Sequence, residues 1–181
     1  YQVVLTRNSD RFVALRERVR IARETGAELF LSLHADSLEF ASVRGASVYT
    51  LSEKASDKEA EKLAAKENRA DVIGGLDLRD QNDDVAAILI SLAQRESMNL
   101  SATFANLLIP EFVEDWRLLR NTHRFAGFAV LKAPDVPSVL VELGYLSNAQ
   151  DERALSSGRT RKPIVIAVVR AVNRYFDALP D

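Results

Sequence analysis

The chain has no cysteine among its 181 residues. Without thiols it can form no disulfide, no thiolate zinc site and no cysteine nucleophile, so a bound metal must be held by histidine, aspartate or glutamate. Histidine is also scarce, because the sequence contains only His34 and His123. Any imidazole ligand from this chain must therefore be one of these two residues.

Several other absences narrow the function. Lys and Arg total 24 against 26 Asp and Glu, so the net charge is −2 and no broad basic field exists for nucleic acid or an anionic membrane. No apolar run is long enough to span a bilayer, and the opening YQVVLTRNSD lacks the features of a signal peptide. There is no Walker loop, no G-x-S-x-G elbow and no H-E-x-x-H motif. We expect neither nucleic-acid binding nor membrane insertion.

The hydrophobic pattern predicts one globular domain in which strands alternate with helices. Strands are expected over residues 1–7, 29–36, 46–50, 125–131 and 138–144. Helices are expected from residue 12 to a C′ glycine at Gly26, over 56–68, from 84 to 108 with Pro110 helping to end the helix, and over 164–179. This alternation is typical of the α/β class, here a three-layer sandwich with a mainly parallel twisted sheet and helices on both faces.

Local patterns add detail to the helices. Residues 56–59 and 147–150 each match a capping box, in which a serine opens a helix. Residues 74–84 are predicted to form a loop. The apolar side of the last helix is predicted to consist of Val165, Val168, Val169, Val172 and Phe176.

Two polar residues end apolar strands. In LFLSLHADS the strand stops at His34, and in VLVEL it contains Glu142. His34 read alone fits a strand-end imidazole that hydrogen-bonds a loop, and Glu142 read alone fits a buried salt bridge with an arginine. Together they also fit a zinc hydrolase, which needs a ligand for the ion and a carboxylate to take a proton from water. His123 lies in NTHRF before a predicted strand, where a surface or loop role is expected.

Longer stretches carry a specific resemblance. Residues 3–37, the segment RGASVYTLSEKASDKEAEKLAAKENRADVIGG and the segment FAVLKAPDVPSVLVELGYLSN closely resemble the zinc-dependent N-acetylmuramoyl-L-alanine amidases of the amidase type 3 family. The chain is most similar to the bacterial cell-division amidases. The resemblance runs from Tyr1 to about Phe176 with the motifs in the family's order.

The resemblance implies a reaction and roles for two residues. The family hydrolyses the amide between N-acetylmuramic acid and the L-alanine of the peptidoglycan stem peptide, in cell-wall remodelling and daughter-cell separation. His34 matches a zinc-ligating histidine, and Glu142 matches the catalytic glutamate. The implied cofactor is one Zn²⁺ per complete domain, and the implied location is the periplasm of the bacterial cell envelope.

The resemblance also implies regulation. In the division amidases a helical insertion covers the active site, and a glutamate from it occupies the metal until an activator protein of the LytM-domain type displaces it. The corresponding insertion here spans about residues 53–115, and the matching inhibitory ligand is Glu67, in AAKENRADVIGG. From the sequence alone, Glu67 also fits an exposed carboxylate on a charged helix.

The family pattern begins earlier than this chain. Its opening strand, a glycine-rich turn with the first zinc histidine and a glutamate ligand in the next helix are all expected upstream of Tyr1. The start within an apolar segment predicts a piece of a longer domain whose first strand region is missing, and we doubt that the 181 residues alone are active. The alternative function is an inactive cell-wall or partner-binding module of the same fold, and a different metallopeptidase on a related sheet is a third possibility.

Overall fold

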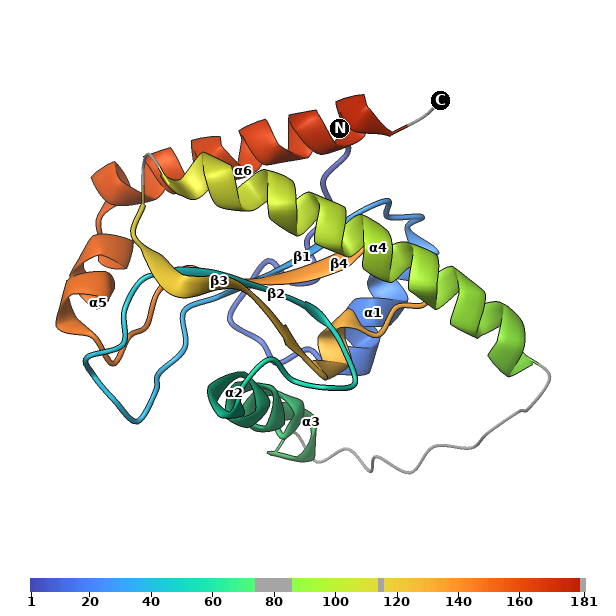
Figure 1. The fold of residues 1–181 in the computed structure, drawn as a ribbon, viewed down its shortest axis with the longest axis horizontal. Coiled ribbons are helices and arrows are strands. Elements are labelled where there is room, and N and C mark those ends of the chain that lie inside the picture. Colours follow the sequence, from blue (N-terminus) through green and yellow to red (C-terminus); the bar gives the residue numbers. More distant parts are fainter. Residues whose placement is uncertain (74–85, 114–115, 180–181) are drawn as a thin grey trace. The chain divides into compact units, whose positions relative to one another are not determined.

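A computed structural model describes residues 1–73, 86–113 and 116–179 (Figure 1). The chain divides into two compact units. The first unit comprises residues 1–30, 51–100 and 125–138, and the second comprises residues 31–50, 101–124 and 139–181. The expected single domain and its insertion at about 53–115 stay predictions. No helix in the described ranges is long and apolar enough to cross a membrane.

The first unit contains α1 (Leu15–Glu24), α2 (Lys58–Asn68), α3 (Ala70–Ile73), the short helix η1 (Ala129–Leu131) and the first part of α4 (Ala86–Val113). α1 ends as predicted, because Gly26 adopts a φ of 64°. The Gly26 N–H donates to Arg23 O at 3.0 Å and the Ala27 N–H donates to Ala22 O at 2.9 Å. This pair of hydrogen bonds is a Schellman motif, which favours glycine at C′.

The second unit contains most of a four-stranded sheet. The strands are β1 (Phe30–His34), β2 (Ala46–Leu51), β3 (Leu118–Ala126) and β4 (Ser138–Glu142), in the order β1-β4-β2-β3. β2 and β4 pair antiparallel, with Ser47 opposite Glu142. β1 and β4 are hydrogen-bonded to each other where both strands start and where both end, which is the pattern of a parallel pair. The same holds for β2 and β3. The α/β class is confirmed, with a mixed sheet.

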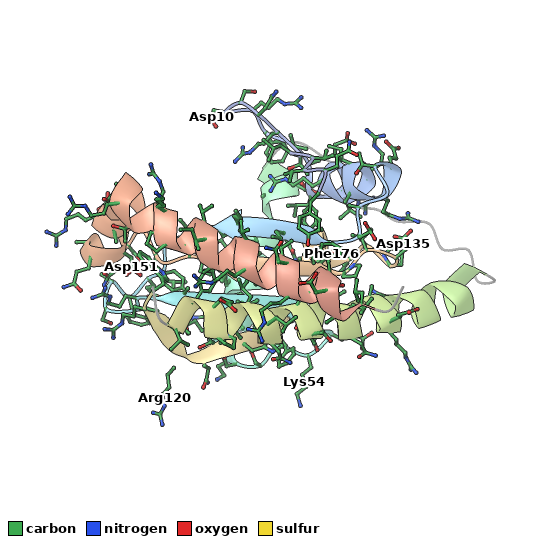
Figure 2. All side chains as sticks on the ribbon, turned by 90° about the horizontal axis from the view of Figure 1, so that it is seen from above. Asp10, Lys54, Arg120, Asp135, Asp151 and Phe176 are labelled. Carbon is green, nitrogen blue, oxygen red and sulfur yellow. The ribbon has the colours of Figure 1, made fainter. Side chains whose placement is uncertain are left out.

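Helices α5 (Ala149–Ser156) and α6 (Gly158–Ala178) complete the second unit. The end of α4 lies beside α6 in Figures 1 and 2. Phe104 and Tyr175 meet edge to face with ring centroids 5.5 Å apart, and Glu111 forms ion pairs with Arg170 and Arg174. The two guanidinium groups lower the pKa of Glu111, with Arg174 contributing most. The arrangement of helices on both faces stays a prediction, because α1, α2 and α3 belong to the first unit.

Two strand predictions are wrong. Residues 1–7 form no strand in the described structure, and Tyr1, Val3 and Leu5 are exposed. An extended segment becomes a strand only when its backbone pairs with a neighbour, and apolar content alone does not supply one. Of residues 125–131, only the first two belong to a strand and the last three form η1, because β3 begins at Leu118 and ends at Ala126. β3 lies at the sheet edge, where polar residues such as those in RNTHR are tolerated.

β1 is also less buried than predicted. Leu33 is 58% exposed, although the continuous apolar run predicted burial on both faces. β1 is the other edge strand of the described sheet. By contrast, every residue of the central strand β4 is buried, as predicted.

Both capping boxes begin one residue too early. Asp57 caps α2 by accepting from the Glu59 and Ala60 N–H groups, and Asn148 caps α5 by accepting from the next helix residues. The preceding serines contact other segments, because Ser56 Oγ accepts from the Phe125 N–H and Ser147 Oγ accepts from the Leu38 N–H. Asp and Asn cap helices at least as well as Ser, so the residue after each serine was also a suitable N-cap by its sequence.

The long helices differ from prediction in their ends and faces. Pro110 lies inside α4, which ends three residues later at Val113. α6 starts at Gly158 and buries Ile164, Ala167, Ala171 and Tyr175, while Val165 and Val169 are 59% and 51% exposed. The buried face of α6 is therefore rotated from the predicted one, and Val168, Val172 and Phe176 are only partly buried. The predicted loop 74–84 lies outside the described residues.

The carboxylate of Asp151 joins three segments of the second unit. It is 1% exposed and accepts hydrogen bonds from the Gly45 N–H at 2.8 Å and the Tyr145 N–H at 3.2 Å. Arg44 Nε lies 3.3 Å from its other oxygen. A Cβ on Gly144 would lie 3.0 Å from Asp151 Oδ2, so the turn after β4 packs directly on this carboxylate.

We predict that Asp151→Ala destabilises the fold. The substitution leaves two N–H groups in buried surroundings without their acceptor, at a cost of about 3 kcal/mol. Thermal unfolding followed by circular dichroism measures the effect. The exposed neighbour Glu152 is the control, and Glu152→Ala should change the melting temperature little. Equal melting temperatures for both variants would contradict the role of Asp151.

Candidate metal centre

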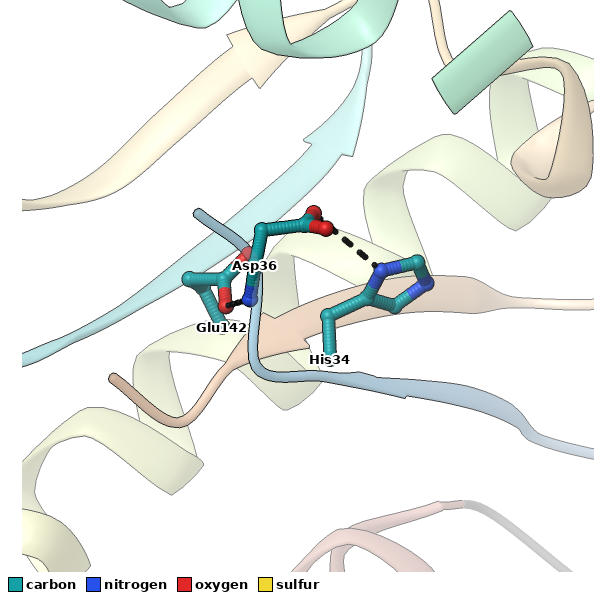
Figure 3. A group of neighbouring side chains, drawn as sticks. All are labelled: His34, Asp36 and Glu142. Carbon is teal, nitrogen blue, oxygen red and sulfur yellow. Dashed lines mark hydrogen bonds and ion pairs between the residues drawn. The ribbon is translucent and has the colours of Figure 1, made fainter. Parts of the chain in front are cut away.

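Three ionisable side chains meet at the carboxyl ends of two neighbouring strands (Figure 3). His34 ends β1, Asp36 follows two residues later and Glu142 ends β4. One ligand atom from each residue lies within 4.8 Å of the other two. All three residues belong to the second unit.

The parallel pairing of β1 and β4 explains why these groups meet. The Leu143 N–H donates to His34 O at 2.9 Å, so the carboxyl ends of the two strands lie together. The Leu146 N–H then donates to Asp36 O at 2.7 Å and holds the two following loops side by side. In open α/β sheets, ligands bind beyond the carboxyl ends of strands.

Glu142 is fully buried and fixed in position. Its Oε1 accepts from the Asp36 backbone N–H at 2.8 Å, and Ser47 lies opposite it on β2. Burial raises the pKa of both Tyr49 and Tyr145, and the negative charge of Glu142 adds to that rise. A carboxylate in such surroundings is stabilised by hydrogen bonds or by a cation.

The two nitrogens of His34 have different neighbours. Nδ1 lies 3.4 Å from Asp36 Oδ2, and Nε2 lies 3.0 Å from Ser32 Oγ. The side chains of His34 and Asp36 are 14% and 16% exposed. The ring is therefore held from both sides while the cluster keeps some access to solvent.

This donor set fits a zinc ion. Imidazole and carboxylate groups are its usual ligands in the absence of cysteine, with bond lengths of about 2.0 to 2.2 Å. Two ligand atoms of a tetrahedral ion are then about 3.4 Å apart. The distance of 3.4 Å between His34 Nδ1 and Asp36 Oδ2 has that size. His34 and Asp36 could thus hold a metal ion beside Glu142.

The structure brings His34 and Glu142 together, as the sequence analysis expected, and their roles stay predictions. It adds Asp36, to which the sequence analysis gave no role. The sequence feature that could have indicated Asp36 is its position just after the strand end in LHAD. An aspartate in an exposed loop would give the same pattern. The placement of the Asp36 carboxylate beside His34 and Glu142 distinguishes the two.

Glu67 and His123 lie in other surroundings. Glu67 is half-buried on α2 in the first unit. Burial lowers the pKa of Arg18, and the carboxylates of Asp71 and Glu67 oppose that shift. His123 lies in β3, not in the expected loop, with Nε2 3.0 Å from Thr50 Oγ1, and burial lowers its pKa.

An α/β sheet with an imidazole and two carboxylates beyond its strand ends defines a candidate metal-dependent enzyme. Residues 1–174 match the N-acetylmuramoyl-L-alanine amidase family, to which the chain therefore belongs. The resemblance noted in the sequence is confirmed.

Individual relatives agree with this assignment. The chain is 38% identical over 174 residues to the N-acetylmuramoyl-L-alanine amidase AmiA of Escherichia coli K12, covering 95% of this chain and 60% of AmiA. It is 35% identical over 178 residues to AmiC of Neisseria meningitidis, covering 98% of this chain and 42% of AmiC. The solved structure of AmiC2 from Nostoc punctiforme shares the fold, with a TM-score of 0.66, 24% identity, and coverage of 97% of this chain and 73% of that chain.

We predict that metal binding depends on one of the two histidines. In the full-length protein, His34→Ala should abolish stoichiometric zinc binding, because it removes the imidazole of the cluster. His123→Ala should retain the metal, since His123 pairs with Thr50. Zinc content per chain after dialysis checks both variants. Full zinc occupancy in His34→Ala would remove His34 from the site.

Proposed function

We propose that the protein is a zinc-dependent N-acetylmuramoyl-L-alanine amidase. The reaction is hydrolysis of the amide that joins N-acetylmuramic acid to the L-alanine of the stem peptide in peptidoglycan. The observation that carries the proposal is the convergence of His34, Asp36 and Glu142 in a member of this family. The chain spans 60% of the length of AmiA, so the proposal concerns the whole protein.

His34 would hold the ion, with Asp36 as a second donor on the same side of the ring. Further ligands, a histidine and a glutamate, are expected from the rest of the protein. When bound, Zn²⁺ supplies Lewis acidity toward the scissile carbonyl and toward the attacking water.

Glu142 would carry the proton transfers. Its carboxylate accepts a proton from the water that attacks the amide carbon, and then gives a proton to the nitrogen of L-alanine as the C–N bond breaks. The products are the carboxylate of the muramyl lactyl group and the free amine of the peptide. The Asp36 N–H holds Oε1, so the carboxylate keeps one orientation through both steps.

The proposed setting follows from the substrate. Peptidoglycan lies outside the cytoplasmic membrane, so we propose an extracytoplasmic, periplasmic location and a role in cell division. The similarity to the amidases AmiA and AmiC supports the substrate from which this setting is inferred.

We predict that Glu142→Gln in the full-length protein retains zinc and loses hydrolysis. Glutamine keeps the shape of the side chain and an acceptor for the Asp36 N–H, but it cannot take the proton, so the rate should fall by about 10² to 10⁴. Release of peptides from purified peptidoglycan and zinc content are the measurements. Unchanged turnover would remove Glu142 from the mechanism, and a zinc-free, inactive parent protein would favour the alternative of a binding module.

We also propose that Glu67 inhibits the basal activity. A carboxylate bound to the metal would exclude the attacking water. The basal activity would then depend on whether Glu67 on α2 occupies the metal. The support is the similarity of AAKENRADVIGG to the insertion of the division amidases. An activator protein of the LytM-domain type would release the inhibition.

We predict that Glu67→Ala raises basal hydrolysis without an activator. Glu61 is an exposed carboxylate on the same helix, so Glu61→Ala is the matched control and should leave the basal rate unchanged. Rates on purified peptidoglycan are compared for the three proteins, with melting temperatures to verify folding. Equal rates for Glu67→Ala and the parent would reject this form of regulation.

A further inference from the structure

We propose that Ser32 is a positioning residue for the metal ligand His34. Its hydroxyl holds Nε2 of the ring and thereby directs Nδ1 to the metal. This inference rests on the proposed zinc-dependent function and assigns a role to a residue outside the ligand set.

The strand geometry places the two side chains together. Ser32 and His34 are two residues apart in β1, so both point to the same face of the sheet. Ser32 is 7% exposed, and its Oγ lies 3.0 Å from His34 Nε2. The strand backbone therefore fixes the serine, and the serine fixes the ring.

The surroundings of the ring decide between its two nitrogens. Nδ1 faces Asp36 Oδ2 at 3.4 Å, whereas Nε2 points away from the carboxylates (Figure 3). If Nε2 carries the proton and donates it to Ser32 Oγ, Nδ1 presents its lone pair toward Asp36. The Nδ1 lone pair and the Asp36 carboxylate repel each other when nothing lies between them. The same arrangement is favourable when both groups bind one cation. The geometry therefore assigns Nδ1 to the metal and Nε2 to Ser32.

A hydrogen bond on the second nitrogen has a known effect on zinc ligands. It fixes the tautomer and the ring orientation, and its loss typically weakens metal binding by about 10- to 100-fold. Ser32 would supply this bond with a hydroxyl, where other sites use a carboxylate or a backbone carbonyl. Removing the hydroxyl should therefore change metal affinity more than stability.

The test is zinc affinity in the full-length protein, measured with Zn²⁺ alone by competition with a chromophoric chelator. Ser32→Ala should bind zinc about 10- to 100-fold more weakly than the parent. Ser32→Thr keeps the hydroxyl and suits a strand, so it should restore most of the affinity. Ser138→Ala removes the hydroxyl of another buried sheet serine, one that donates to Val136 O, and should bind zinc like the parent.

The outcomes separate this inference from the proposed function. A parent that binds no zinc overturns both. A parent that binds zinc, with Ser32→Ala equal to it, overturns only the role of Ser32. A loss in Ser32→Ala that Ser32→Thr restores supports the role, because a packing defect would not follow the hydroxyl.

A second measurement, by NMR, uses the parent protein and therefore needs no folded Ser32 variant. In protein labelled with ¹⁵N-histidine and loaded with zinc, the His34 signal, assigned with His34→Ala, should show a protonated Nε2 and a metal-bound Nδ1. A metal-bound Nε2 would overturn the inference.

Discussion

The burial of Glu142 is the constraint on which the candidate site depends. A carboxylate with no solvent exposure at the end of a central, fully buried strand must be compensated locally. The Asp36 N–H supplies one hydrogen bond, and it can do so only because β1 runs parallel to β4 and ends beside it. That same arrangement places His34 and the Asp36 carboxylate next to Glu142. The compensation of one buried charge therefore assembles the whole cluster.

Much of this arrangement is visible in the sequence. The apolar runs LFLSLHAD and SVLVEL predict two strands, of which β4 is fully buried and β1 only partly, and each run carries a polar residue at its carboxyl end. Gly26 fixed the end of α1 for a local reason, since its φ of 64° favours glycine. Features that depend on a short stretch of chain or on strong burial were thus predictable, including the α/β class and the positions of His34 and Glu142.

The features that the sequence did not reveal depend on distant partners. Ser56 and Ser147 match helix caps locally, yet each hydrogen-bonds another segment and the next residue caps the helix. α6 buries Ile164, Ala167, Ala171 and Tyr175, while Val165 and Val169 face solvent, and periodicity alone does not distinguish these two neighbouring faces. Asp36 was missed for the same reason, because its place in the cluster depends on Glu142, 106 residues away in the chain.

The backbone that follows Glu142 is held by hydrogen bonds from several segments. After β4, Leu143 donates its N–H to His34 O, and Trp116 Nε1 donates to Leu143 O at 2.7 Å. Asp151 then accepts from the Tyr145 N–H, so the turn is fixed at successive residues. Preorganised groups need no reorganisation when charge develops, which is the main source of electrostatic catalysis. The side chains of His34 and Asp36 are 14% and 16% exposed, whereas Glu142, the proposed base, is fully buried. A buried, hydrogen-bonded carboxylate beside more accessible donor groups would suit the proposed hydrolysis, because the proton acceptor would keep its orientation toward the attacking water.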